Sequence, residues 1–482
     1  MVRDSSGHAI GTLRREDFQV FDNRKPQEII QFSAEKSEPD NPPGSTSSKS
    51  AGFVVPASFT ALLFDDLHLS FQNLPLLQQA STQLLSTALA RSERLGIFTT
   101  SGKITVDFTD DRAKLQDAIR RLRPNPLPGS MPSSCPTLTH ADANQIVNRH
   151  DLATREAAVS EVMGQCGVKD PKAALDIVMA SAERQLNADD QQTSTVLQAL
   201  SALIDRLLTL RGRRTIVLAS PSFLVSDREH REYQVVDRAV RAHVIISTLD
   251  SRGLYGDDQD DGIDSNILGE FADSTGGLFF RNNNDLASGL RRAVAPPEFV
   301  YQLGFSPSSL QQDGKFHRLQ VKLTGGLKFS VSAREGYFAP AQPADAAQAE
   351  NKIITDALFS SSQIRDLPVQ IHTQFARDAK PATTTTLTVQ AMVDLRSLPH
   401  RQVNEQNVNE LRVVGAVFDR DGKYMGALDK KIPVRWSPQR EGTMIGATFS
   451  FLLDPGAYLV RLVVRDTESQ HLYAQDALVE IP

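Results

Sequence analysis

The stretch that most constrains the fold lies at residues 59–70 and has the sequence FTALLFDDLHLS. Its apolar run is short and unbroken, which is typical of a strand buried on both faces rather than a surface strand with alternating polarity. Two carboxylates, Asp65 and Asp66, follow the run directly. We therefore predict a buried parallel strand whose polar end lies at the carboxyl edge of a sheet.

Residues 53 to about 305 alternate strand-like and helix-like segments, which indicates a parallel sheet covered by helices on both faces. The predicted strands are 60–66, 94–99, 104–108, 214–220, 243–249 and 277–281. The predicted amphipathic helices are 74–90, 112–122, 195–210, 232–242 and 266–274. A polar segment with helices of its own, at 152–163 and 171–185, interrupts this order. We assign 53–296 to one α/β domain with an insertion at 124–192.

The rest of the chain is predicted to be β-structure. Residues 1–34 show period-2 alternation, and residues 297–340 contain a hairpin that can pack with them. Residues 353–482 carry strands at the spacing of a β-sandwich, and linkers are expected at 35–52 and 341–352. The predicted fold class is α/β, with a doubly wound, mostly parallel sheet, accessory β segments and a C-terminal β-sandwich.

Composition argues against nucleic-acid binding and against a membrane-spanning helix. The chain of 482 residues has a net charge of -6, so it lacks the basic footprint of a nucleic-acid-binding protein. No apolar run approaches the roughly 18 residues of a membrane-spanning helix, and the first residues lack the apolar core of a signal peptide. Taken alone, these features predict a cytoplasmic protein with no membrane span.

The two cysteines give a conflicting indication. Cys135 and Cys166 flank a polar part of the insertion, and a disulfide between them would be expected in an oxidising compartment. Two separate buried thiols are the alternative. A nucleophilic pair of one cysteine with His140 or His150 has little support, because no third residue that would orient the histidine can be named.

Three stretches of the sequence together resemble a known family. They are VRDSSGHAIGTLRREDFQVFDNRKPQEIIQF at the start, DDLHLSF with GIFTTSGKITVDFTDD in the α/β domain, and YQLGFSPSSLQQDGKFHRLQVKLTGG with AREGYFAP after it. The chain is similar over most of its length to bacterial VWFA-related domain proteins of the Acidobacteria type. The resemblance implies a von Willebrand factor A-like fold, a binding role, and an extracytoplasmic location with the leader missing from this chain.

The resemblance also implies a candidate metal site. Asp66, His68 and Ser70 fall on the Asp-x-Ser-x-Ser metal loop of A-type domains, with His68 in place of the middle serine. Thr193 or Thr195 falls near the second element of the site, a threonine that opens a helix, although either could simply cap that helix. The third element is an aspartate after the fourth strand. Here Pro221 or Ser222 occupies its place.

These replacements leave two expectations for the metal loop. Mg²⁺ prefers oxygen ligands, so an imidazole and a missing carboxylate weaken the site or shift its preference among metals. Asp250, at the end of a neighbouring predicted strand, or Asp65 could supply the missing oxygen. The loop is expected either to hold one divalent cation, Mg²⁺ or Mn²⁺, or to be vestigial and held by internal hydrogen bonds.

Three functions remain open at this point. The first is a non-enzymatic, adhesion-type protein that binds a protein ligand where the strands end, since open parallel sheets bind partners beyond the carboxyl ends of their strands. The second is a structural envelope scaffold with a decayed metal site. The third is a metal-dependent hydrolase that uses Asp66, His68 and Asp250 around a metal.

Overall fold

The computed structural model describes most of the chain. The described residues are 2–4, 9–36, 56, 58–86, 93–127, 135–221, 223, 231–254, 266–294, 299–305, 315–331, 333, 336–339, 346–360, 363–377, 385–395, 398, 400–403, 406–437, 444–469 and 471–481. Ser222 and most of the expected linker at 35–52 lie outside them. No helix within these residues is long and apolar enough to span a membrane.

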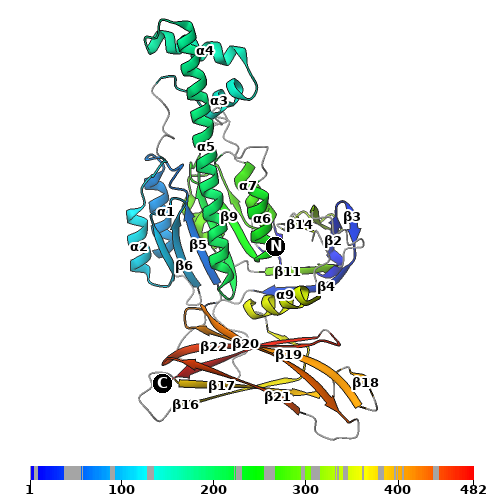
Figure 1. Ribbon diagram of the computed structural model, residues 1–482. Coiled ribbons are helices and arrows are strands. Elements are labelled where there is room, and N and C mark those ends of the chain that lie inside the picture. The colour runs from blue at the N-terminus through cyan, green and yellow to red at the C-terminus, as the bar shows by residue number, and fades with distance from the viewer. Residues whose placement is uncertain are drawn as a thin grey trace.

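A six-stranded sheet forms the centre of the α/β domain (Figure 1). Its order is β10-β9-β8-β5-β6-β7, and every neighbouring pair is parallel except β6 and β7. Every residue of β5 is buried, as the apolar run predicts. The strands are β5 (Ser58–Phe64), β6 (Glu93–Thr99), β7 (Thr105–Thr109), β8 (Arg213–Ser220), β9 (Val244–Asp250) and β10 (Phe279–Phe280).

Helices cover both faces of this sheet. One face packs against α1 (Leu74–Ser86), α2 (Arg112–Arg121) and α8 (Leu286–Val294). The other packs against α6 (Arg231–Arg241), α7 (Asn266–Thr275) and the C-terminal part of α5 (Pro171–Leu208). The prediction of a mixed α/β domain is therefore confirmed, although the sequence pattern did not reveal α8.

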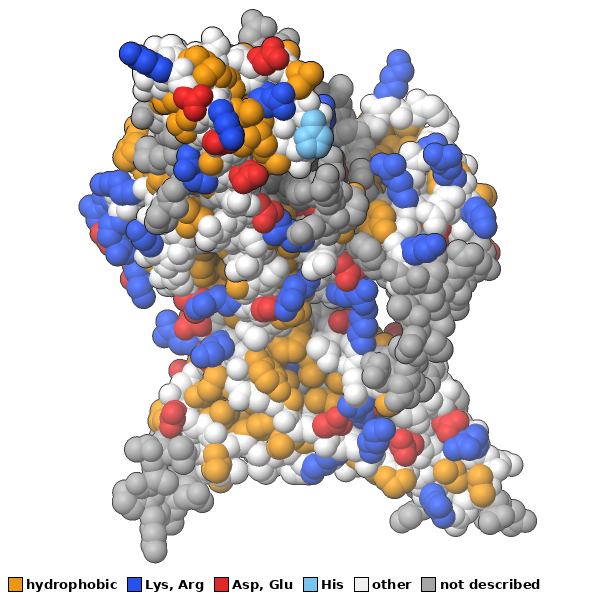
Figure 2. Space-filling model, turned by 45° about the horizontal axis from the view of Figure 1, so that its top comes forward, with side chains coloured by type: hydrophobic (Ala, Val, Ile, Leu, Met, Phe, Trp, Pro, Cys, Tyr) orange, Lys and Arg blue, Asp and Glu red, His pale blue; other side chains and the backbone are white. Residues whose placement is uncertain are grey.

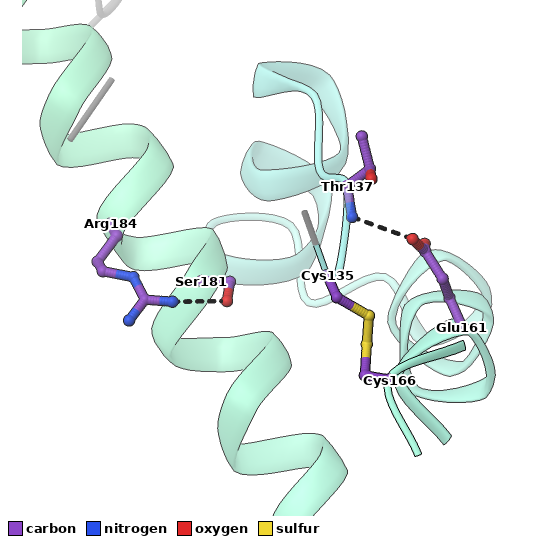
Figure 3. Close-up of a disulfide and its surroundings, with 6 residues drawn as sticks. All are labelled: Cys135, Thr137, Glu161, Cys166, Ser181 and Arg184. Atoms are coloured by element: carbon purple, nitrogen blue, oxygen red, sulfur yellow. Dashed lines mark hydrogen bonds between the residues drawn. A yellow bond between two sulfur atoms is a disulfide. The ribbon is translucent and has the colours of Figure 1, made fainter. Parts of the chain in front are cut away.

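A helical arm extends beyond the carboxyl ends of the strands (Figure 1). It consists of α3 (His140–Val147), α4 (Leu152–Gln165) and the N-terminal half of α5, which share a small apolar core. A disulfide joins Cys135 to Cys166, with Cα atoms 6.0 Å apart, and the backbone N–H of Thr137 donates to Glu161 beside it (Figure 3). The arm is thus held together by packing and by a covalent bond.

Helix α5 corrects two expectations. The sequence predicts separate helices at 171–185 and 195–210 with a cap near Thr193, but the structure has one helix of 38 residues. Asp170 caps it by accepting from the N–H groups of Lys172 and Ala173, and Pro171 occupies the first turn. Thr193 and Thr195 lie inside the helix, so neither opens it. The polar residues between the two predicted helices contain no Gly or Pro that would break the helix.

A small β module combines the N-terminal segment with residues 299–339. Strand β2 pairs with β12, β4 with β11, and β1 with β13, all antiparallel. Its elements are β1 (Val2–Arg3), η1 (Arg15–Asp17), β2 (Phe18–Asp22), β3 (Lys25–Gln27), β4 (Ile29–Lys36), β11 (Phe299–Phe305), β12 (Phe316–Leu323), β13 (Ser330–Val331) and β14 (Gly336–Phe338).

The C-terminal region is β-rich, and two sheets enclose one apolar core. The expected linker at 341–352 is partly wrong, because residues from 346 onward belong to α9 (Ala346–Phe359), which packs on β22. The strands are β15 (Ile364–Arg365), β16 (Val369–Arg377), β17 (Thr385–Asp394), β18 (Arg401–Val403), β19 (Gln406–Asp419), β20 (Tyr424–Trp436), β21 (Met444–Leu453), β22 (Gly456–Asp466) and β23 (Leu472–Ile481).

A buried charge cluster joins the C-terminal region to the α/β domain. The carboxylate of Asp476 accepts from Arg211 at 2.7 Å, from Arg461 at 3.1 Å and from Gln363 at 2.7 Å. Arg211 also donates to the carbonyl of Ser360, just after α9. Burial lowers the pKa of Arg211 to about 10, against the opposing charge of Asp476. The single carboxylate of Asp476 therefore offsets the positive charge of two buried guanidinium groups.

Asp476→Asn should destabilise the junction strongly. The side chains of Arg211 and Arg461 are 6% and 0% exposed, and removing one partner of such a buried set costs about 3 kcal/mol or more. We expect a clear fall in the urea midpoint of unfolding. The control Asp237→Asn, which removes an exposed pair with Arg241 on α6, should change the free energy of unfolding by about 0.5 kcal/mol or less. Equal losses for the two variants would contradict the assignment.

Candidate functional site

The carboxyl edge of the sheet is organised around the buried carboxylate of Asp65. Its Oδ2 accepts from the hydroxyl of Ser220 at 2.7 Å and lies 2.8 Å from Nδ1 of His68. Its Oδ1 accepts from the hydroxyl of Thr100 at 3.0 Å. Ser220 is the last residue of β8, and His68 and Thr100 follow β5 and β6. Asp65 therefore ties together the loops on both sides of the point where the strand order reverses, which is where open α/β sheets bind ligands.

Asp65 and His68 favour each other's charged form. Burial alone raises the pKa of Asp65, but the charge of His68 and hydrogen bonds from His68, Ser220 and Thr100 together hold that pKa below its usual value. Burial alone lowers the pKa of His68, but the charge and hydrogen bond of Asp65, with a further contribution from Asp189, raise it above its usual value. At pH values between about 4 and 6.5 the two groups therefore form an ion pair.

Asp66 is held by the loop after β6. Its Oδ1 accepts from the hydroxyl of Thr100 at 3.0 Å and from the backbone N–H of Ser101 at 2.9 Å. Its Oδ2 accepts from the hydroxyl of Ser101 at 2.6 Å, and its carbonyl accepts from the N–H of Asn125. Both carboxylate oxygens are therefore engaged inside the protein, and the side chain is 2% exposed.

His68 connects the edge to the helical arm. Its ring stacks on Phe223, with centroids 6.0 Å apart, and Asp189 on α5 interacts electrostatically with the imidazole. Asp189 in turn accepts from Gln185 and lies 2.8 Å from Nδ1 of His140 on α3. Contacts between charged and aromatic side chains therefore connect the segment at residues 66–70 to the base of the arm.

The residues predicted as metal ligands have separate partners in the structure. Ser70 accepts from the N–H of Asn73 at the start of α1, and the hydroxyl of Thr195 donates to the carbonyl of Gln191 within α5. Thr193 is buried in the middle of the same helix. Asp250 accepts from the guanidinium group of Arg252 at 2.7 Å.

As arranged, this donor set does not fit a divalent cation. Within the described part of the chain, no three His, Cys, Asp or Glu side chains form a group that could hold a metal ion. The carboxylates that would supply charge are paired with His68 and Arg252 or accept from hydroxyl and N–H donors of Thr100 and Ser101. Pro221, at the position of the third metal-loop element, has no side-chain donor.

Two exposed apolar side chains at this edge were missed by the sequence analysis. Phe71, in the loop after β5, is 74% exposed, and Leu254, after β9, is 65% exposed. The loop after β9 approaches α1, the helix that follows the loop of Phe71, because a Cβ placed on Gly253 would lie 3.6 Å from Leu76 in the first turn of α1. A signal was present in the sequence: both residues lie just beyond the polar ends of predicted strands, where an apolar side chain has no core to enter.

Comparison with known proteins identifies no family. No protein-family model matches the chain, and no curated protein matches it. Among solved structures, an aerotolerance-related membrane protein from Bacteroides fragilis is 11% identical, covering 49% of this chain and 98% of its own, with a TM-score of 0.24. BatB from Bacteroides thetaiotaomicron is 12% identical, covering 49% and 97%, with a TM-score of 0.25.

A third similarity concerns a smaller part of the chain. β-Glucuronidase 2 from Bacteroides uniformis is 15% identical over 23% of this chain, with a TM-score of 0.16. This chain spans only 13% of the length of that enzyme. At these identities and TM-scores, the similarities define neither a family nor an activity for this protein.

The ion pair of His68 and Asp65 should make stability depend on pH. Because the pKa of His68 is raised on folding, its contribution is complete below the unfolded value of about 6.5 and is lost as the pH rises through the folded pKa. Because the pKa of Asp65 is lowered, its contribution is lost only as the pH falls below about 3.9 and through the folded value. Full stabilisation therefore lies between about pH 4 and pH 6.5.

His68→Asn tests this, since asparagine retains a donor but does not titrate. The difference in unfolding free energy between the wild type and this variant should be larger at about pH 5.5 than at about pH 8.5. His372→Asn, at an exposed position of β16, should change stability little at either pH. A difference that stays constant or grows with pH would refute the buried ion pair.

Proposed function

We propose that this chain is a non-enzymatic protein-binding protein with a von Willebrand factor A-type domain that engages its partner at the carboxyl edge of the sheet. Two observations support the domain type: the order of the six strands, and the position of the DDLHLS loop at the reversal point. The C-terminal region braces the opposite, amino-terminal edge through α9 and Asp476. The carboxyl edge, from which the helical arm extends, is the end of the sheet where we place binding.

The observation that carries the proposal is the pair of exposed apolar side chains, Phe71 and Leu254. Large apolar groups at the centre of a polar rim are typical anchors of protein interfaces. Polar residues are next or close to both in the chain, Gln72 beside Phe71 and Arg252 two residues before Leu254. The hydrogen bonds of Asp65 and Asp66 hold the underlying loops, so the anchors are presented on a rigid base, which lowers the entropic cost of binding.

We further propose that this edge binds without a resident divalent cation. Asp66 and Asp250 already have protein partners, and a ligand carboxylate would find no open metal position to complete. The same pairing argues against the metal-dependent hydrolase, which needs Asp66, His68 and Asp250 around one ion. In the structure each of them contacts a different residue: Ser101, Asp65 and Arg252 respectively.

We propose an extracytoplasmic location for the protein. The disulfide between Cys135 and Cys166 supports it, because such bonds persist in oxidising compartments and are rare in the cytosol. Under this proposal the arm, which the disulfide braces, faces partners outside the cytoplasm. Intact-mass measurement of protein taken from its native compartment without reducing agent tests the location, and two free thiols would contradict it.

The double variant Phe71→Ser/Leu254→Ser should lose the partner without losing stability. Burying one such side chain in an interface contributes roughly 1.5–3 kcal/mol, so the pair should change affinity by far more than tenfold. The measurement is quantitative mass spectrometry of proteins captured from an extracytoplasmic extract of the source organism by the wild type and by the variant. The expected result is a protein strongly enriched by the wild type only.

The matched control is Phe375→Ser/Leu452→Ser, which removes two exposed apolar side chains from β16 and β21. It should retain the same partner. If no protein depends on Phe71 and Leu254, or if both double variants lose it equally, binding at the edge is refuted and the scaffold hypothesis is favoured.

The thermal unfolding midpoint tests the absence of a cation. After chelation, adding excess Mg²⁺ or Mn²⁺ should leave the midpoint of the wild type and of Asp66→Asn unchanged relative to their own chelated samples. A cation bound only by the folded state at a hundred times its dissociation constant would stabilise by about 2.7 kcal/mol. A rise of that size in the wild type, abolished in Asp66→Asn, would contradict the proposal.

A further inference from the structure

A groove lies between α1 and α2 on the outer face of the α/β domain. Its volume is about 570 Å³. Glutamines 78, 79 and 83 of α1 line one side, and Arg120 and Arg123, at and just after the end of α2, line the other. Thr82 and Ser86 continue the α1 side. The groove therefore combines a row of neutral hydrogen-bonding groups with two cations.

Charge is distributed unevenly over this groove. None of the described residues that line it is acidic, although the whole chain has a net charge of -6. Helix α2 adds Arg112, Lys114 and Arg121, and Lys and Arg side chains gather at the left of the molecule, where α2 lies (Figure 2). The nearest counter-charge is Asp117, which lies 3.3 Å from Arg120 and 3.0 Å from Arg121. An anionic ligand would meet a net positive field here.

The two arginines that line the groove are positioned by protein contacts, and each retains N–H donors for a ligand. The Nη1 of Arg123 donates to the carbonyls of Arg120 and Leu122 at the end of α2, which holds the guanidinium group in place. Arg120 contacts Asp117 through Nη2 and is 74% exposed. A guanidinium group has five N–H donors in a planar fork that suits a carboxylate. Each arginine can therefore bind a ligand carboxylate in addition to its present contact.

The glutamines favour a peptide among anionic ligands. A glutamine amide has both donors and an acceptor, which match the N–H and C=O groups of an extended backbone. Gln78 is held in place because its Nε2 donates to the carbonyls of Ile119 and Leu122, so it offers a ligand only its Oε1 as an acceptor. From Gln78 to Ser86, α1 runs about 12 Å at about 1.5 Å per residue. That length accommodates about four residues of extended chain at about 3.3 Å each.

We propose that the groove between α1 and α2 binds an extended acidic peptide segment of a partner protein. Its Glu or Asp side chains pair with Arg120 and Arg123, and its backbone bonds to the glutamine amides of α1. This site does not rest on the proposed binding at the carboxyl edge. The residues that line the groove are distinct from Phe71 and Leu254, so either site can fail while the other stands.

Fluorescence anisotropy with a labelled peptide of alternating Glu and Ser residues tests the proposal on the full chain. The wild type should bind this peptide, with an affinity that falls as salt is added. Arg120→Gln/Arg123→Gln should bind roughly tenfold more weakly, since two exposed charge pairs are lost. Asp117→Asn should bind more tightly than the wild type, because it removes the carboxylate that competes for Arg120.

The matched control is Lys25→Gln/Lys328→Gln, which removes the same charge from exposed positions of the β module. It should bind like the wild type. The proposal is overturned if the peptide does not bind, if the control weakens binding as much as the arginine variant, or if Asp117→Asn fails to strengthen it. Binding of heparin without binding of the peptide would also overturn it and would assign the groove to a sulfated polysaccharide.

Discussion

The buried carboxylate of Asp65 is the interaction on which the carboxyl edge depends. Its oxygens join the ends of three strands, because they accept from Thr100 after β6, from Ser220 at the end of β8 and from His68 after β5. Burying a carboxylate costs free energy unless its oxygens accept hydrogen bonds, so the three donors stabilise Asp65 as one network. At the segment where the resemblance implies a metal loop, the structure has these internal contacts, with Nδ1 of His68 2.8 Å from Asp65.

The opposite edge of the sheet is also fixed by an aspartate carboxylate that pairs with basic side chains. There Asp476 stands between the guanidinium groups of Arg211 and Arg461, and Arg461 also donates to the carbonyl of Ala357 in α9. Such a set specifies one docking geometry, because a shifted interface would strand a buried charge. The α/β domain is therefore braced at both ends of its strands, and what remains for recognition is its outer loops and helix faces.

The sequence predicted the elements better than the contacts between them. The apolar run that ends at Phe64 indicated a buried strand, and period-2 alternation indicated the β-rich regions, since burial on one face or two leaves a direct pattern. It did not reveal that Thr100 and Ser101 would saturate Asp66, because that depends on which strands become neighbours. The prediction of two separate helices in place of α5 was wrong for a physical reason. The central residues of the helix do not pack on the sheet, so they lack the apolar periodicity of a buried face but keep their helical propensity.

Helix α5 has a mechanical consequence. At about 1.5 Å per residue its 38 residues extend roughly 57 Å, with no proline after the first position and no glycine at which it could bend. It begins in the disulfide-braced arm, is clasped near its middle by His140 and Arg231, and ends three residues before Arg211. It is therefore a stiff lever. Its stiffness links the orientation of the arm to the sheet on which its C-terminal half packs and to the junction that follows.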